Sequence, residues 1–157
     1  MPIPNAPDPG ALKYLDRQLR GTVDGWETIL QQTVTILAHE NDNYDWTGVY
    51  LVEADNLILG PFVGAPTEHR RIPIGRGICG AAAADRATIV VDDVGSDPRY
   101  LACFATTLSE IVVPILDGDR VIGEIDVDSD RPAAFGDDDR QLLEAVADRL
   151  ARLAPKG

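Results

Sequence analysis

The feature that most constrains the fold of this chain is a hairpin signal in its second half. Asp117-Gly118-Asp119 separates two runs rich in β-branched residues, 111–116 and 121–127, and such a turn between such runs is typical of a β-hairpin. In the second run apolar and acidic residues alternate. Successive side chains of a strand point to opposite faces, so one face should be apolar and the other anionic. The acidic residues concerned are Glu124, Asp126 and Asp128.

A fourth carboxylate is expected beside them. Glu110 stands at the far end of the first run, and pairing about the turn would bring it close to Asp126 and Asp128. Clustered carboxylates repel one another unless a cation lies among them, and a ligand ammonium, an arginine or a metal ion would serve. The alternative is a solvated outer face on an acidic protein. Spacing alone does not decide between the two.

The rest of the chain reads as four helices and four further strands. Helical periodicity or propensity covers residues 11–20, the segment from 22–24 to 39, the short stretch 81–84 and the closing segment 137–153, and strand patterns cover 46–52, 57–63, 71–74 and 88–91. Hairpins dominate over βαβ units, which predicts an α+β domain with a largely antiparallel sheet of about six strands. We expect a single domain over residues 11–157, preceded by a proline-rich flexible leader over residues 1–10.

Composition excludes several partners. A net charge of −12 repels phosphate backbones and anionic membranes, so a nucleic-acid or membrane partner is not expected. No apolar run approaches the roughly 20 residues that cross a bilayer, and no signal peptide is recognisable. These features predict a soluble cytoplasmic protein, whose two cysteines would then be free thiols.

The two cysteines are Cys79 and Cys103. Cys79 lies where a glycine-rich turn meets a helix, and the helix dipole there would stabilise a thiolate. The alternative for Cys79 is a small buried apolar residue. Cys103 lies in a loop-like region between strands, where its alternative role is packing beside Phe104. His39 and His69 have no ligand spacing, so no metal site is predicted.

The turn before Cys79 matches the letters of a dinucleotide-binding motif, at residues 75–80. That motif requires a preceding parallel strand, a long crossover helix and an acidic residue about 20 positions later. The expected helix is short, and Asp92 comes too early. We therefore reject a dinucleotide site.

Six motifs, taken together and in order, resemble the GAF domain family, and more narrowly its free methionine-(R)-sulfoxide reductase branch. They are DWTGVYL at 45–51, LGPF at 59–62, IPIGRGICG at 72–80, LAC at 101–103, SEIVVP at 109–114 and VIGEIDVDS at 121–129. The resemblance covers about residues 22–153. It implies a six-stranded antiparallel sheet with helices packed on one face and a ligand pocket on the other.

The resemblance also implies a reaction, the thiol-dependent reduction of the R-sulfoxide of free methionine. It assigns the nucleophile to Cys103, and it places around the substrate Glu110, Asp126, Asp128, Trp46 and Tyr50. No bound cofactor is implied; a thioredoxin-like protein would supply electrons. The position of the family's usual resolving cysteine holds His69, which leaves Cys79 as the other thiol of the chain.

Two interpretations follow. The first is the enzyme, with Cys103 attacking and Cys79 resolving, although helix position alone would nominate Cys79 as nucleophile. The second is a GAF module that binds a small molecule or senses redox state without catalysis. It is motivated by His69, by Phe104 where the family usually has Asp, and by a sensor-like loop at residues 97–100. A sensor module usually belongs to a longer chain with an output domain, and none is recognisable here. The sequence leaves a homodimer open.

Overall fold

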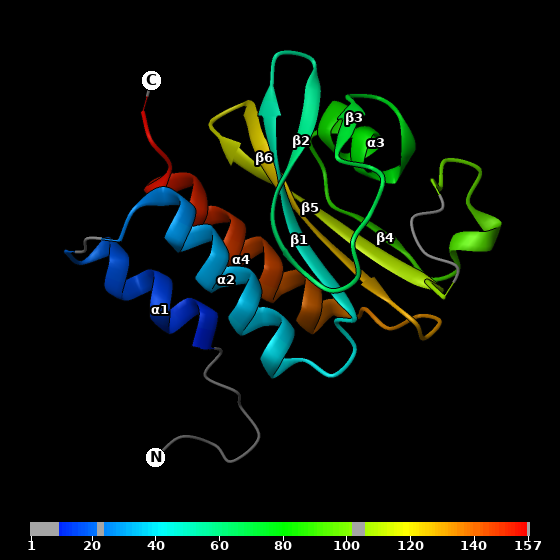
Figure 1. Cartoon of the computed structure of the whole chain (residues 1–157), viewed down its shortest axis with the longest axis horizontal. Helices are drawn as coiled ribbons and strands as arrows, with labels where there is room; N and C mark the ends of the chain where they lie inside the picture. The colour runs from blue at the N-terminus through cyan, green and yellow to red at the C-terminus, as the bar shows by residue number, and fades with distance from the viewer. Residues whose placement is uncertain (1–9, 22–23, 102–105, 157) are drawn as a thin grey trace.

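The computed structural model describes residues 10–21, 24–101 and 106–156 (Figure 1). The helices are α1 (Gly10–Leu19), α2 (Trp26–Glu40), α3 (Gly77–Asp85) and α4 (Asp137–Leu153), with a 3-10 turn, η1, at Val94–Ser96. The strands are β1 (Trp46–Glu53), β2 (Asn56–Val63), β3 (Arg71–Pro73), β4 (Ile89–Val91), β5 (Ser109–Asp117) and β6 (Arg120–Ser129). The elements confirm the predicted α+β class.

The strands form one sheet in the order β3-β2-β1-β6-β5-β4, and every neighbouring pair is antiparallel. Both predicted hairpins are present. The join between β1 and β6 places the first hairpin beside the last and makes β6 a central strand. An entirely antiparallel sheet has no crossover of the dinucleotide-binding kind, which agrees with the rejection of that motif.

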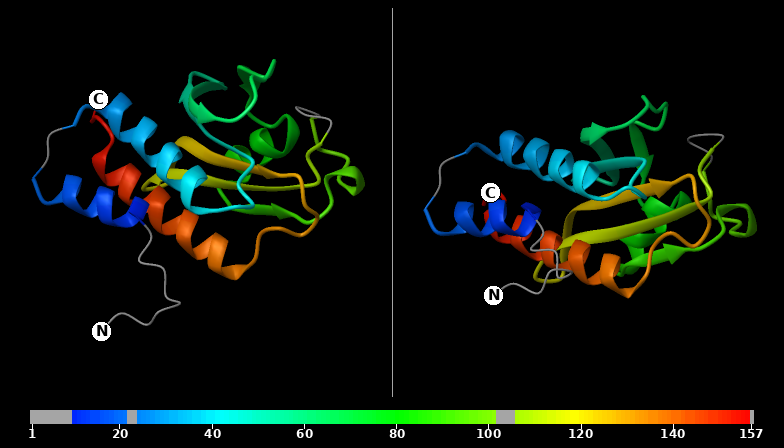
Figure 2. Two further views of the ribbon diagram at one scale, coloured as in Figure 1. Left: turned by 60° about the horizontal axis from the view of Figure 1, so that its bottom comes forward. Right: turned by 90° about the horizontal axis from the view of Figure 1, so that it is seen from below.

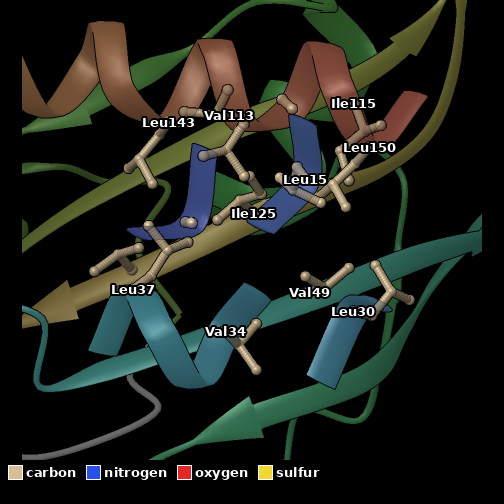
Figure 3. Packing of buried hydrophobic residues seen from close by; sticks show 14 of the residues in the cluster. Leu15, Leu30, Val34, Leu37, Val49, Val113, Ile115, Ile125, Leu143 and Leu150 are labelled. Atoms are coloured by element: carbon tan, nitrogen blue, oxygen red, sulfur yellow. The ribbon is translucent and has the colours of Figure 1, made fainter. Parts of the chain in front are cut away.

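Three helices cover one face of the sheet (Figure 2). Helix α2 packs on β1 and β2, α4 packs on β5 and β6, and α1 packs against α2 and α4. The apolar residues of β6, β5 and β1 point into this layer, where Ile125, Val113 and Val49 meet Leu143 and Leu37 (Figure 3). Burial of each such side chain stabilises the fold by about 1.5–3 kcal/mol, so this layer holds the sheet in place.

Helix α3 lies against the opposite face, where its residues Ile78 and Cys79 pack with Tyr50 and Val112. The helix begins at Gly77, four residues before the predicted start, because the glycine-rich turn is already its first turn. A Cβ on Gly80 would lie 2.7 Å from the Pro73 carbonyl oxygen, so only glycine permits this close packing on the preceding segment. The helix boundary predicted from propensity was therefore wrong. Because the helix starts earlier than predicted, Cys79 lies within it.

The predictions of a leader and of a cellular location both stay predictions. The predicted leader over residues 1–10 falls almost entirely outside the described residues and stays a prediction. No helix of the described part is long and apolar enough to cross a membrane. The predicted cytoplasmic location also stays a prediction.

Candidate functional site

Strand pairing aligns the predicted site residues in rows on the face opposite the three helices. One row runs from Trp46 through Asp128 to Glu110, since Trp46 pairs with Asp128 and Asp128 pairs with Glu110. The next row contains Gly48 and Asp126. Directly opposed residues share a face, with Cβ atoms about 4.5–5.5 Å apart. The sheet therefore brings together the carboxylates that the hairpin signal predicted.

The anionic face is buried. The exposed fraction is 5% for Glu110, 0% for Glu124, 3% for Asp126 and 3% for Asp128, so the solvated-face alternative is wrong. Both carboxylate oxygens of Glu124, and one oxygen each of Asp126 and Asp128, have no hydrogen-bond partner among the described residues. Buried polar groups are normally paired. These oxygens therefore mark a place where a ligand is expected.

Burial and mutual repulsion favour the protonated forms of these acids. Burial, followed by the charges of Asp126 and Asp128, raises the pKa of Glu110 well above its usual value. Burial and the charge of Asp126 do the same to the pKa of Glu124 and Asp128. Burial also raises the pKa of Asp126, although the neighbouring Glu110 carboxyl and Cys79 thiol oppose the rise. The cluster can hold protons that an exposed carboxylate would have lost.

We expect Glu124→Gln to stabilise the protein at alkaline pH by about 1–3 kcal/mol. The pKa of folded Glu124 exceeds 4.5, its ordinary value, so the folded state binds the proton more tightly than the unfolded state. Wild-type stability therefore falls as pH rises from about 4.5 through the raised pKa, and glutamine removes this contribution. Denaturant unfolding at pH 5 and pH 8 measures it. Glu53→Gln, at the exposed end of β1, should change stability little at either pH, and equal shifts in both variants would contradict the prediction.

Cys79 lies in the first turn of α3 and packs directly over the carboxylates. It is buried, and the pKa of its thiol is raised well above the ordinary value, first by burial and then by the charges of Asp126 and Glu124. The expectation that the helix dipole stabilises a Cys79 thiolate is therefore wrong. Sequence position identified the dipole, but the tertiary packing supplies a stronger and opposite influence.

Aromatic side chains from β1 and β2 form a wall beside the carboxylates. The ring of Trp46 stacks on Phe62 with centroids 5.5 Å apart, and the centroid of Tyr50 is 6.5 Å from that of Trp46. Two hydrogen bonds fix the wall: the Trp46 indole donates to the Ala65 carbonyl over 2.9 Å, and the Tyr50 hydroxyl donates to the His69 carbonyl over 2.8 Å. Trp46 and Tyr50 are thus held beside the anionic cluster.

A hollow of about 160 Å³ reaches this wall. It is lined by Asp45, Trp46, Ala65, Thr106, Thr107, Asp128 and Asp130. Because Asp128 belongs to both the hollow and the carboxylate cluster, the hollow borders the site.

Gly48 provides the floor under Trp46. A Cβ at this position would collide with the six-membered ring of Trp46, lying 2.7 Å from its Cζ3 atom, and would lie 3.0 Å from Cβ of Phe62. The ring therefore occupies the space above the glycine. Sequence reasoning overlooked Gly48 and Phe62. It placed Glu124 on the anionic face but did not include it among the residues expected to contact the substrate.

We expect Gly48→Val to displace Trp46 and to destabilise the protein by about 1–3 kcal/mol, the usual cost of overpacking. Ligand binding should weaken as well, because the displaced indole enters the site. Thermal unfolding and calorimetric titration with free methionine measure the two effects. Gly118→Ala, in the exposed β5–β6 turn, is a control for stability alone, because it should leave ligand affinity unchanged. An unchanged tryptophan emission spectrum of Gly48→Val in a Trp26→Phe background, which leaves Trp46 as the one tryptophan, would contradict the prediction.

Cys103, the predicted nucleophile, lies outside the described residues, so its predicted role stays a prediction. The structure brings together all five predicted substrate-contacting residues, although their roles are likewise untested. Chemically, the site offers buried acids that can bind a cation or donate a proton, and an aromatic wall suited to an apolar group.

The comparisons with known proteins agree with this geometry. A family model described as the GAF domain matches residues 25–153. The chain is 40% identical over 147 residues to the free methionine-R-sulfoxide reductase of Saccharomyces cerevisiae, covering 87% of this chain and 81% of the yeast protein. It is 37% identical over 124 residues to the Escherichia coli protein of the same name, covering 79% of this chain and 74% of that protein.

A solved structure extends the likeness to three dimensions. The free methionine-R-sulfoxide reductase of Neisseria meningitidis, in complex with its substrate, superposes with a TM-score of 0.82. The two sequences are 37% identical, and the match covers 90% of this chain and 84% of the other. The predicted fold and its predicted branch are both confirmed.

Proposed function

The chain belongs to the GAF domain family, in the branch of the free methionine-R-sulfoxide reductases, and from this premise we propose that it reduces free methionine-(R)-sulfoxide to methionine. The observation that carries the proposal is the buried cluster of Glu110, Asp126 and Asp128 beside the aromatic wall. A buried cluster of acids in which Asp126 and Asp128 each keep one oxygen without a hydrogen-bond partner among the described residues suits the ammonium group of a free amino acid. A methionine within a protein chain has no such group.

The carboxylate cluster and the aromatic wall would bind opposite ends of the substrate. The ammonium of the substrate would lie among Glu110, Asp126 and Asp128, where its charge offsets their mutual repulsion. The methyl-sulfoxide end would lie against Trp46 and Tyr50, whose rings offer apolar surface. The recognition of both ends selects a small zwitterion over a peptide.

The reaction needs a nucleophile and an acid. The Cys103 thiolate would attack the sulfoxide sulfur, and a buried carboxylic acid would protonate the departing oxygen. The protonated oxygen passes from the substrate sulfur to the Cys103 sulfur, so methionine leaves as the thioether and Cys103 becomes a sulfenic acid. A second thiol, from Cys79 or from an external reductant, then forms a disulfide with release of water. A thioredoxin-like protein would restore the dithiol by thiol–disulfide exchange.

The test is NADPH consumption in the presence of thioredoxin and thioredoxin reductase. Free methionine-(R)-sulfoxide should be turned over, whereas its S-epimer and N-acetyl-methionine-(R)-sulfoxide, which lacks the ammonium, should not. The acetylated compound is the sharper control because only the amine differs. The proposal is contradicted if free methionine-(R)-sulfoxide is not turned over, or if N-acetyl-methionine-(R)-sulfoxide is turned over equally well.

One observation favours a second candidate, a GAF module that binds a small molecule without reducing it. The raised pKa of the Cys79 thiol opposes its ionisation, and a thiol that stays protonated resolves a sulfenic acid slowly. Calorimetric titration with methionine and with methionine sulfoxide, followed by mass analysis of the ligand, separates the candidates. A binding module would hold the sulfoxide and release it unchanged.

A further inference from the structure

We propose that the buried side chains of Cys79, Glu110 and Asp126 form a binding site for a thiophilic divalent transition metal such as Zn²⁺, with Glu124 beside it. Each of the three residues offers one ligand atom, and the three atoms lie within 4.8 Å of one another. They come from α3, β5 and β6, so the fold itself assembles the set. This site goes beyond the proposed reductase function and does not depend on it.

The separations suit a small metal ion after a modest closure. Zinc binds cysteine sulfur at about 2.3 Å and carboxylate oxygen at about 2.1 Å in tetrahedral geometry, so neighbouring ligand atoms lie about 3.4–3.6 Å apart. The three ligand atoms already lie within 4.8 Å of one another, so binding of the ion would draw them somewhat closer together.

A second observation points to a ligand at the same place. The side chain of Asp126 is only 3% exposed, and its Oδ1 atom has no hydrogen-bond partner among the described residues. Both oxygens of Glu124, which is fully buried, are likewise unpartnered within that part of the chain. No ion pair formed between described residues supplies a cation to these acids. A bound cation would satisfy these oxygens and neutralise the cluster.

The sulfur ligand decides which metals would bind. A thiolate prefers Zn²⁺ or Co²⁺, whereas Mg²⁺ and Ca²⁺ prefer all-oxygen sites with more ligands. The hollow lined by Asp128, which pairs with Glu110 across the hairpin, lies next to this cluster. Because Glu110 and Asp126 are also the proposed ammonium ligands, the metal and a free amino acid would compete for one site.

Cobalt titration of the apoprotein tests the proposal, because thiolate-bound Co²⁺ has a near-ultraviolet charge-transfer band. The Cys103→Ser variant is used, since it leaves Cys79 as the one cysteine of the chain. We expect one equivalent of Co²⁺ to produce the band, Zn²⁺ to bleach it, and a large excess of Mg²⁺ to leave it unchanged. Absence of the band, or its loss to Mg²⁺, overturns the proposal.

Matched variants assign the ligands. Cys79→Ser in the natural background should lose the band, with circular dichroism confirming the fold, and its persistence there would place the metal on Cys103. Glu110→Gln in the Cys103→Ser background should weaken Co²⁺ binding at least about tenfold, whereas Glu53→Gln should not change it. Equal affinity in the Glu110 and Glu53 variants overturns the site. No substrate is involved, so the outcome is independent of reductase activity.

Discussion

Replacing Cys103 by serine is expected to lower kcat for free methionine-(R)-sulfoxide by about 10³-fold or more, because a hydroxyl cannot replace a thiolate that accepts the sulfoxide oxygen. Affinity for the substrate should survive, since the predicted ammonium contacts come from Glu110, Asp126 and Asp128. The coupled NADPH assay measures the first effect, and calorimetry measures the second. Retained affinity with lost turnover would identify a chemical role.

The matched comparison is Cys79→Ser, which removes the other thiol. If Cys79 resolves the sulfenic acid, this variant should still release one equivalent of methionine in a single turnover and then stall with thioredoxin as reductant. The raised pKa of the Cys79 thiol predicts that even the wild-type resolving step is slow at neutral pH and faster at alkaline pH. Full steady-state turnover by Cys103→Ser would reverse the assignment of the nucleophile.

The second large effect is expected for Asp126→Asn. Asparagine keeps the shape of the side chain but removes the charge proposed to face the substrate ammonium and a candidate proton donor, so kcat/KM should fall by about 10²–10⁴-fold. The free energy of unfolding should not fall, because an uncharged amide replaces a buried acid whose pKa is raised by burial. Lost activity with retained stability excludes unfolding as the cause.

Asp119→Asn is the control for Asp126→Asn. It makes the same chemical change in the same hairpin, but at an exposed position of the turn, and should leave kcat/KM within about twofold of wild type. A parallel loss of activity in both variants would mean that overall negative charge, rather than the buried site, governs the reaction.

The hairpin and its charge pattern were readable from the sequence because they depend on local order. A turn signal at 117–119 and alternation along the following strand fix which residues share a face, and Glu110 followed from the same pairing. The sequence did not show whether that face is exposed to solvent. The burial of Glu124 and Asp126 depends on α3, which is distant in sequence and packs on them only after folding.

The same reason explains the other omissions. Phe62 contacts Trp46 across the β1–β2 pair, whose register shifts between Gly48 and Tyr50, and no periodicity reveals such an irregularity. The thiol of Cys79 was expected to ionise because the helix dipole is a local property. Its raised pKa comes from burial and from carboxylates on β5 and β6, which are tertiary properties.

Strand β6 is buried on both faces, with Ile125 and Val127 toward the helices and Asp126 and Asp128 toward the site. A slip of one residue against β1 or β5 would turn every side chain over, pressing carboxylates into the leucine-rich layer. Mispaired forms of the hairpin are therefore penalised far more heavily than in a sheet with two apolar faces. The acidic residues of the site therefore also disfavour the wrong strand register during folding. Uncharged replacements at several of these positions together should yield more protein that mispairs and aggregates.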